Sequence, residues 1–403
     1  MGEHVRVLIV DDSALVRRAL REILGSDPDI QIIGEAANGK EALALAEELR
    51  PDLITMDVRM PVMDGVETTE QLMAYRPTPI LVITASLNRY DVDISFKMLG
   101  AGALEVMEKP NMADREALER VRRELVQRVK FLARVRVVTH LRGRRRNNAT
   151  DSTPIARLAL PPLYGQAASL APAPARPVAP PASPPVVPTK PAKASGPAKV
   201  ALQPAKPKTR RAVVPFPLVV IGASTGGPRV VQRILMGLPK DFPAALVVVQ
   251  HIAEGFSAGM VEWLSDTCEL PTKLALDGSQ LAQGLVWVAP DGHDLAIQRG
   301  GYLHLTNQQF LLHRPSPSVD VTMQTAAEVF GPRTIGVLLT GMGRDGAIGM
   351  QQIHQAGGYT IAQNEATCTI YGMPRAAVEA GATHEVLAPD DIILALQRRI
   401  SST

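Results

Sequence analysis

The chain has 403 residues, 46% of them hydrophobic, and at about 150 residues per domain this length allows two or three domains with sizeable cores. With only two cysteines, a disulfide-rich secreted scaffold is excluded and a reducing compartment is expected. The first residues lack the apolar core of a signal peptide, and no apolar run reaches the roughly 18 residues of a membrane span. We expect a cytoplasmic protein that does not insert into membranes.

Charge is distributed unevenly along the chain. Residues 1–130 carry a net charge of −6, residues 131–217 carry +14 and residues 218–403 carry −5. The overall charge of +3 therefore describes neither flank. Because both flanks are acidic and show no basic stripe, we expect no nucleic-acid partner.

The basic middle segment is rich in proline and alanine. Residues 151–217 hold 17 of the 33 prolines and show no hydrophobic periodicity. Alternating Ala and Pro favours solvated polyproline II segments, which bury too little apolar surface to fold. We predict one domain over residues 1–128, a helix extension and disordered linker over 129–212, and a second domain over 213–403.

In the first domain, short apolar runs alternate with helical patterns. The predicted strands cover residues 5–10, 30–36, 52–57, 79–86 and 104–110, and predicted helices cover residues 13–24, 41–50 and 115–136. Strands that are nearly continuous in Val, Ile and Leu are expected where helices cover both faces of a parallel sheet. The pattern predicts a doubly wound α/β domain.

Acidic residues and a lysine follow three of these strands. The carboxyl ends of parallel strands meet at one edge of a sheet, so we expect Asp11, Asp12 and Asp57 to lie together beside Lys109. Clustered carboxylates repel one another unless a cation such as Mg²⁺ shares their oxygens. With the Thr84 hydroxyl nearby, this group suits attack on phosphorus. Each Asp alone is also typical of a helix N-cap or a turn, so the prediction depends on the cluster.

The motifs VDDS, MDVRMPVMDG, ITAS and EKP occur in this order and resemble those of response-regulator receiver domains. The resemblance implies a five-stranded parallel, flavodoxin-like fold. It also implies that Asp57 is the phospho-acceptor and that Thr84 and Lys109 form the switch pair. The implied Mg²⁺ ligands are Asp11, Asp12, Asp57 and the main-chain carbonyl of Arg59. Receivers often carry an aromatic residue three positions before the lysine, where this chain has Val106.

A similar alternation returns after the linker. The predicted strands cover residues 218–224, 245–252, 285–290, 335–341 and 359–364, predicted helices include residues 229–238 and 345–356, and residues 293–298 and 301–306 are predicted to pair as a hairpin. We predict a Rossmann-like α/β domain with a β-hairpin beside the sheet.

The run GASTGG, from Gly222 to Gly227, lies between a predicted strand and a predicted helix. It matches the G-x-S-x-G pattern of a tight turn that exposes a serine hydroxyl, here that of Ser224. Amide groups at the start of the helix could stabilise an oxyanion. A phosphate-binding loop is the alternative, although the run lacks the G-K-[ST] ending of a P-loop.

A serine nucleophile needs a base. Among eight histidines, His251 directly follows the strongly apolar run ALVVVQ, which places it at the same sheet edge as Ser224. His293, in the turn PDGHD, is the second candidate base, and a histidine at a strand end can equally be structural. Asp345, in the loop after another strand, could orient the imidazole.

The loop that holds Asp345 also contains a G-x-G-x-x-G pattern at Gly341, Gly343 and Gly346, with Glu365 about 20 residues further on. This spacing leaves a dinucleotide-binding loop as an alternative. Against it, the Asp345 carboxylate would repel a pyrophosphate, and the motif does not open the first βαβ unit of the domain.

The set GASTGGP, QHI and TGMGRDG resembles the catalytic domain of the chemotaxis protein-glutamate methylesterases, which also carry an N-terminal receiver. The resemblance implies that Ser224 is the nucleophile, His251 the general base and acid, and Asp345 the orienting acid. It further implies that the Met342 amide belongs to the oxyanion hole and that Thr225 lies beside the nucleophile.

The same resemblance implies a phosphorylation-activated hydrolase. It would demethylate γ-glutamyl methyl esters on methyl-accepting chemoreceptors, release methanol and deamidate particular receptor glutamines. Its partners would be those receptors and a chemotaxis histidine kinase, and we expect a monomer. Mg²⁺ would serve the receiver alone, with no cofactor in the ester step. A phosphorylation-controlled binding module and a dinucleotide-dependent enzyme are the alternatives.

Overall fold

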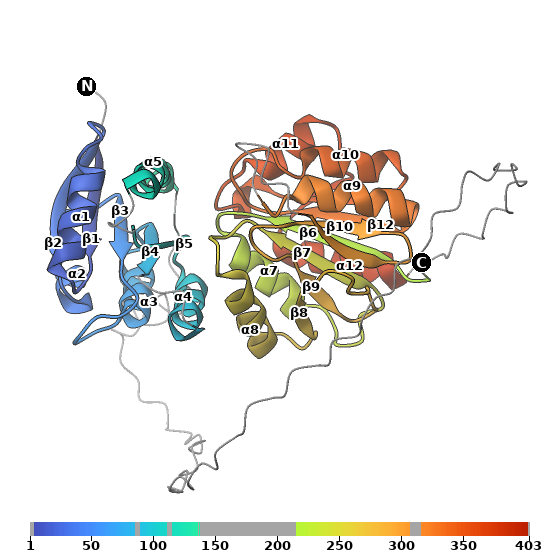
Figure 1. Cartoon of the computed structure of the whole chain (residues 1–403), viewed down its shortest axis with the longest axis horizontal. Helices are drawn as coiled ribbons and strands as arrows, with labels where there is room; N and C mark the ends of the chain where they lie inside the picture. The colour runs from blue at the N-terminus through green and yellow to red at the C-terminus, as the bar shows by residue number, and fades with distance from the viewer. Residues whose placement is uncertain are drawn as a thin grey trace, which may run out of the picture. The chain divides into compact units, whose positions relative to one another are not determined.

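The computed structural model describes residues 4–84, 89–110, 115–135, 137, 215–306 and 316–401, with the side chains of residues 89–90 and 115–120 left out. These residues form two α/β domains, each built on its own parallel sheet (Figure 1). The predicted linker lies almost entirely outside the described residues, and the domain boundaries stay a prediction. Among the described helices, none combines the length and the apolar character that crossing a bilayer requires.

The N-terminal domain contains a five-stranded sheet in the order β2-β1-β3-β4-β5, with every pairing parallel. Its elements in chain order are β1 (Val5–Val10), α1 (Ala14–Leu24), β2 (Ile30–Ala36), α2 (Gly39–Leu49), β3 (Leu53–Met56), α3 (Gly65–Tyr75), β4 (Ile80–Thr84), α4 (Arg89–Ala101), β5 (Glu105–Glu108) and α5 (Arg115–Leu132). This strand order is that of flavodoxin-like folds, in which ligands bind beyond the carboxyl ends of β1 and β3.

Both faces of this sheet are buried because side chains alternate along each strand. In β1, Val7 and Ile9 pack with residues of α1 and α5, whereas Leu8 and Val10 pack with residues of α2, α3 and α4. The helix α5 ends at Leu132, before the predicted end at residue 136, and its last turns are buried against the sheet.

The C-terminal domain contains a seven-stranded parallel sheet in the order β14-β13-β12-β6-β7-β9-β8. Its strands are β6 (Leu218–Ala223), β7 (Ala245–Gln250), β8 (Thr272–Leu274), β9 (Val286–Val288), β12 (Thr334–Leu338), β13 (Tyr359–Gln363) and β14 (Glu385–Leu387), and β10 (Asp294–Gln298) pairs with β11 (Tyr302–Thr306) as an antiparallel hairpin. The chain runs outward in opposite directions from β6 and from its neighbour β12. The carboxyl ends of these two strands therefore form a topological switch point, where open α/β sheets bind their ligands.

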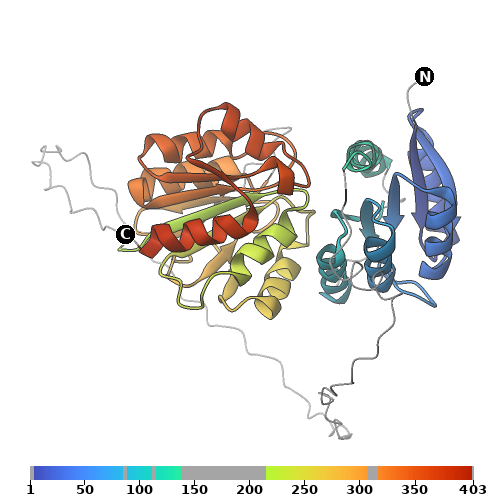
Figure 2. The same ribbon diagram turned by 180° about the vertical axis from the view of Figure 1, so that it is seen from behind.

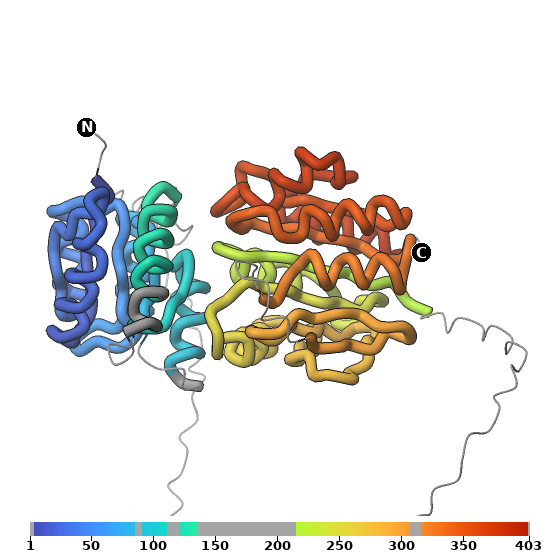
Figure 3. The backbone as a smooth tube through the Cα atoms, turned by 45° about the horizontal axis from the view of Figure 1, so that its top comes forward, coloured from blue at the N-terminus to red at the C-terminus, as the bar shows by residue number. Residues whose placement is uncertain are grey.

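Helices cover both faces of the second sheet. They are α7 (Gly227–Met236), α8 (Ser257–Thr267), α9 (Val319–Phe330), α10 (Ala347–Gln355), α11 (Met373–Glu379) and α12 (Pro389–Ser401), with 3-10 turns η1 (Gly331–Arg333) and η2 (Glu365–Thr367). Residues of α7, α8 and α12 pack with Val219 and Ile221 on one face, and Figure 2 shows α7 and α12 along it. Residues of α9, α10 and α11 pack with Leu218 and Val220 on the other, where α9 and α10 lie side by side (Figure 3).

The predicted fold class is confirmed in both domains: two parallel sheets covered by helices, with the expected hairpin in the second. The edge strands β8 and β14, of three residues each, were not predicted from the sequence. Such short strands carry too few side chains for a period of two to stand out.

Candidate active site

The run after β6 forms the tight turn expected around Ser224. Gly226 adopts a φ of 75°, in the left-handed region that glycine enters without steric cost, and α7 begins at the next residue. The Ser224 N–H donates to the Thr340 carbonyl at 3.0 Å, and the Gly227 N–H donates to the Ser224 carbonyl at 2.8 Å. These bonds fix the serine backbone between the ends of β6 and β12.

His251 follows β7, the strand that pairs with β6 so that Gln250 lies opposite Ala223. Its backbone N–H donates to the Ala223 carbonyl at 2.9 Å, which places it at the same edge as Ser224. The imidazole is largely buried, and its Nε2 lies 2.8 Å from Oδ2 of Asp345. His293, the second candidate base, has its Nδ1 3.2 Å from the Asp291 carbonyl oxygen instead.

The Asp345 carboxylate lies at the N-terminus of α9. Its Oδ1 accepts from the Ser318 hydroxyl at 2.9 Å and the Asp320 amide at 3.1 Å, and its Oδ2 accepts from the Val319 amide at 2.7 Å. Burial alone would raise the pKa of Asp345, but the hydrogen bond and charge of His251, with the α9 amides, outweigh it and lower that pKa. The carboxylate is therefore held as an anion beside the imidazole.

Asp320 is a second carboxyl in this cluster. Burial, with a further contribution from the charge of Asp345, raises the pKa of Asp320 to about 6 against the opposing hydrogen bond from the Gly349 amide. Of these two neighbouring carboxyls with opposite pKa shifts, Asp345 is the one that ionises more readily. Neither Asp320 and Ser318 nor the start of α9 could be predicted as part of the site, because nothing in their spacing along the sequence connects them to Asp345.

Gln250 is a further residue of the site that was not predicted from the sequence. Its side chain is 2% exposed, and its Nε2 donates to the carbonyls of Ser224 and of His251, both at 2.8 Å. One amide group thus joins the backbone of the nucleophile loop to that of the histidine loop. The letters QHI place a glutamine at this position without indicating the direction of its side chain.

The loop after β12 approaches the nucleophile closely. A Cβ atom at Gly341 would lie 2.6 Å from Ser224 Cβ and 2.3 Å from Met373 Sδ, so only glycine fits there. The Thr340 hydroxyl donates to the Thr225 carbonyl at 3.0 Å. Met342, which follows Gly341 in this loop, is 49% exposed. Glu365, which the dinucleotide alternative requires, is ion-paired with Arg375 at 3.2 Å.

A small cavity of about 20 Å³ lies against this site. Its lining includes Ser224, Thr225, Gln250 and His251 from the C-terminal domain. Ser224 and His251 thus line one cavity, and a ring nitrogen of His251 is hydrogen-bonded to the Asp345 carboxylate. A serine, a histidine and an orienting carboxylate are the groups from which sites for nucleophilic acyl hydrolysis are built.

The acidic cluster of the N-terminal domain is assembled at the carboxyl edge of its sheet. Asp11 and Asp57 are buried, Asp12 is exposed, and one carboxylate oxygen of each lies within 4.8 Å of the others. Lys109 Nζ lies 2.7 Å from Oδ2 of Asp11 and 3.0 Å from Oδ1 of Asp57. Gathered carboxylate oxygens are the donor set that Mg²⁺ takes in proteins, so these residues fit that ion.

The electrostatics of this cluster are unusual for carboxylates. Burial, together with the charge of Asp11, raises the pKa of Asp57 to about 6, although the charge and hydrogen bond of Lys109 oppose the rise. Burial alone would lower the pKa of Lys109, but hydrogen bonds and charges from Asp11 and Asp57 outweigh it and raise that pKa. The cluster thus holds more negative charge than Lys109 compensates, as a cation site would.

The other predicted residues of this domain lie around the cluster. Thr84 is buried at the end of β4, and its carbonyl accepts from the Lys109 N–H at 2.7 Å. The Arg59 side chain is ion-paired with Asp91. Val106, in the position that is often aromatic, is 3% exposed. The contribution of the Arg59 carbonyl to a metal site stays a prediction.

Comparison with known proteins identifies both domains. Residues 219–396 match the family model of CheB methylesterase, and residues 7–122 match that of the response regulator receiver domain. Two similar relatives are named protein-glutamate methylesterase/protein-glutamine glutaminase. One, from Syntrophus aciditrophicus, is 36% identical and covers 99% of both chains; the other, from Geobacter metallireducens, is 38% identical and covers 97% of this chain and 98% of its own.

This chain belongs to the CheB methylesterase family. The resemblances to receivers and to chemotaxis methylesterases are therefore confirmed, and neither the binding module nor the dinucleotide-dependent enzyme is favoured. Among solved structures, the catalytic domain of Thermotoga maritima CheB methylesterase is 38% identical, covers 46% of this chain and all of its own, and has a TM-score of 0.45.

Proposed function

We propose that Ser224, His251 and Asp345 are the catalytic triad with which this CheB methylesterase hydrolyses γ-glutamyl methyl esters on methyl-accepting chemoreceptors. The observation that carries the proposal is the 2.8 Å contact between His251 Nε2 and Asp345 Oδ2. His251 and Ser224 line the same cavity. The names of the relatives support the substrate class.

In this proposal the Ser224 hydroxyl attacks the ester carbonyl while His251 takes its proton. Because the Asp345 carboxylate accepts from Nε2–H, the imidazole has its free lone pair on Nδ1, and Nδ1 is the basic nitrogen. This assignment is the reverse of the serine-protease template, in which the carboxylate binds Nδ1–H. The imidazolium then protonates the leaving methoxide, methanol departs, and water hydrolyses the glutamyl-serine ester by the same proton route.

The oxyanion formed in each step needs donors, and we assign the Met342 amide to that task. No described residue accepts a hydrogen bond from that amide. A primary amide passes through a similar tetrahedral intermediate and needs the same donors, so the site also suits deamidation of receptor glutamines, with ammonia leaving in place of methanol. This chemistry agrees with the second activity in the relatives' names.

We further propose that phosphorylation of Asp57 by a chemotaxis histidine kinase activates the esterase. Asp11, Asp12 and Asp57 would hold Mg²⁺, whose charge offsets that of the transferring phosphoryl group. Lys109 lies within ion-pair distance of two of these carboxylates and would contact the phosphoryl group once it is attached, with Thr84 as its switch partner. Because the proposed phosphoryl donor is a histidine kinase and the proposed substrates are receptor signalling domains, the proposal includes a cytoplasmic location.

The test is mass spectrometry of methylated receptor signalling fragments after incubation with the full-length protein, with and without acetyl phosphate and Mg²⁺. We expect loss of methyl groups and conversion of particular glutamines to glutamates, both accelerated by the phosphodonor. Asp57→Asn should keep the slow reaction and lose the acceleration. Receptors that keep their methyl groups under every condition would contradict the proposal.

A further inference from the structure

The N-terminal domain also lines the cavity at the proposed nucleophile. The lining includes Leu104, which precedes β5, and Glu105, the first residue of β5, together with Ser224 and His251. A volume of about 20 Å³ is close to what one water molecule occupies and is far too small for a methyl glutamate side chain. The structure therefore represents a state in which substrate is shut out.

Glu105 makes the polar contact in this closed state. Its Oε2 accepts a hydrogen bond from the Thr225 hydroxyl at 3.0 Å, and its Oε1 is ion-paired with Arg128 of α5. One residue earlier, the Leu104 carbonyl accepts from the Gly226 N–H at 3.3 Å. Thus a carboxylate and a carbonyl oxygen are bound by the two residues that directly follow Ser224.

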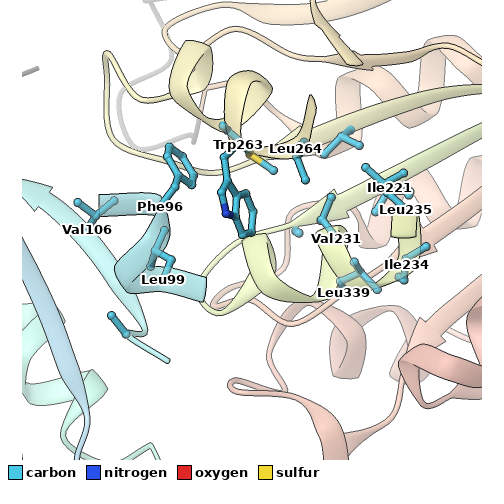
Figure 4. Packing of buried hydrophobic residues seen from close by; sticks show 14 of the residues in the cluster. Phe96, Leu99, Val106, Ile221, Val231, Ile234, Leu235, Trp263, Leu264 and Leu339 are labelled. Carbon is cyan, nitrogen blue, oxygen red and sulfur yellow. The ribbon is translucent and has the colours of Figure 1, made fainter. Parts of the chain in front are cut away.

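Apolar packing holds Glu105 in this place. Phe96 of α4 stacks on Trp263 of α8, with ring centroids 5.5 Å apart, and Figure 4 shows Leu99 and Val106 beside them. A Cβ atom at Gly259 of α8 would lie 2.0 Å from a side-chain carbon of Val92, so the two helices meet where a side chain is missing. The contact between α4 and α8 is made by apolar side chains. Glu105, in contrast, brings a carboxylate group to the Thr225 hydroxyl.

A glutamate carboxylate is also the product that the proposed reaction forms on the receptor. Hydrolysis of a γ-glutamyl methyl ester leaves a glutamate carboxylate at the nucleophile, and Glu105 is a glutamate whose carboxylate binds the Thr225 hydroxyl in the cavity that Ser224 also lines. The inference rests on the proposed function. We propose that Glu105 is an internal product mimic, and that the Thr225 hydroxyl is a subsite which binds a substrate glutamyl carboxyl group when the receiver has moved away.

The same strand connects this contact to the phosphorylation site. Glu105 begins β5, and Lys109, which is ion-paired with Asp57 and Asp11, directly follows its last residue. A displacement of Lys109 toward a phosphoryl group on Asp57 would therefore act on the strand that carries the mimic. Release of Glu105 would both open the cavity and free the Thr225 hydroxyl.

The first experiment measures methanol release by unphosphorylated full-length protein. Hydrogen bonds to a charged group are worth about tenfold or more in an equilibrium constant, so Glu105→Ala should raise basal activity about tenfold, and Glu105→Gln, which keeps a weaker neutral bond, should raise it less. The matched control is Glu124→Gln, since Glu124 also pairs with Arg128 and is not part of the cavity lining. It should leave basal activity unchanged. Basal activity of Glu105→Ala equal to wild type would overturn the mimic.

The second experiment probes the subsite itself with a ligand that resembles the product. We expect N-acetylglutamate methylamide to inhibit the phosphorylated full-length protein, and N-acetylnorleucine methylamide, its uncharged counterpart, to inhibit far less. Thr225→Val should weaken inhibition about tenfold and Thr225→Ser should restore it. Equal inhibition of wild type and Thr225→Val would overturn the subsite. If phosphorylated wild type releases no methanol, the proposed function has failed instead, which keeps the two failures distinct.

Discussion

Gln250 offers a prediction whose size follows from the structure. Its amide donates to the Ser224 and His251 carbonyls, and the side chain is buried. Gln250→Met keeps approximately the same volume and removes both donors. The Ser224 carbonyl keeps a bond from the Gly227 amide, so the variant mainly leaves the His251 carbonyl without the side-chain donor.

A buried polar group without its partner costs about 1–3 kcal/mol, and the second lost bond adds about 1 kcal/mol. For a domain of this size, each kcal/mol lowers Tm by roughly 2–4 °C, so we expect a fall of about 4–16 °C. The loops of the nucleophile and the base would no longer be joined. A misplacement of about 1 Å at reacting groups costs on the order of 100-fold in rate, which is the loss of kcat that we expect.

The assay is methanol release from methylated receptor by phosphorylated full-length protein, with kcat and KM measured separately and Tm from calorimetry. KM should change little because Gln250 contacts backbone carbonyls within the protein. Thr334→Val is the control: it removes a buried hydroxyl that donates to the Ala326 carbonyl at 3.2 Å, at the opposite end of β12 from the site. It should lower Tm and leave kcat intact. A Gln250→Met protein with kcat within twofold of wild type would refute the positioning role.

Three further predictions concern the carboxyl groups. Asp345→Asn should lower kcat about 10⁴-fold, by losing the anion that orients His251, and a loss below tenfold in steady-state assays would contradict that role. The raised pKa of Asp320 means that the folded state binds its proton more tightly than the unfolded state, so stability falls as pH rises from about 4 to about 6. Asp320→Asn should flatten this part of the Tm–pH curve, and a curve parallel to wild type would exclude the effect. Chelation of Mg²⁺ should abolish activation by acetyl phosphate and leave basal methanol release unchanged; basal release that also falls would contradict a metal-free ester step.

Much of the architecture could be predicted from the sequence because strands buried on both faces are continuous in Val, Ile and Leu. The rule that parallel strands end at one edge was enough to bring Ser224 and His251 together. It also gathered the Asp cluster beside Lys109. These are consequences of local pattern and topology.

Other parts of the site depend on side-chain directions that no spacing encodes. The Gln250 amide bridges two loops only because β6 and β7 are adjacent, and the start of α9 reaches Asp345 only in the folded chain. Which imidazole nitrogen faces Asp345 is equally a result of packing. Glu105 looks, in the sequence, like an ordinary first residue of a strand.

The central claim is that Ser224 is the nucleophile of a glutamyl methylesterase. The most direct measurement is methanol release from methylated receptor by phosphorylated full-length Ser224→Ala protein, alongside wild type and Ser265→Ala, a helix serine bonded to the Val261 carbonyl. We expect wild type and Ser265→Ala to release methanol at equal rates and Ser224→Ala to release none above background. Methanol release by Ser224→Ala at a rate comparable to wild type would contradict the account.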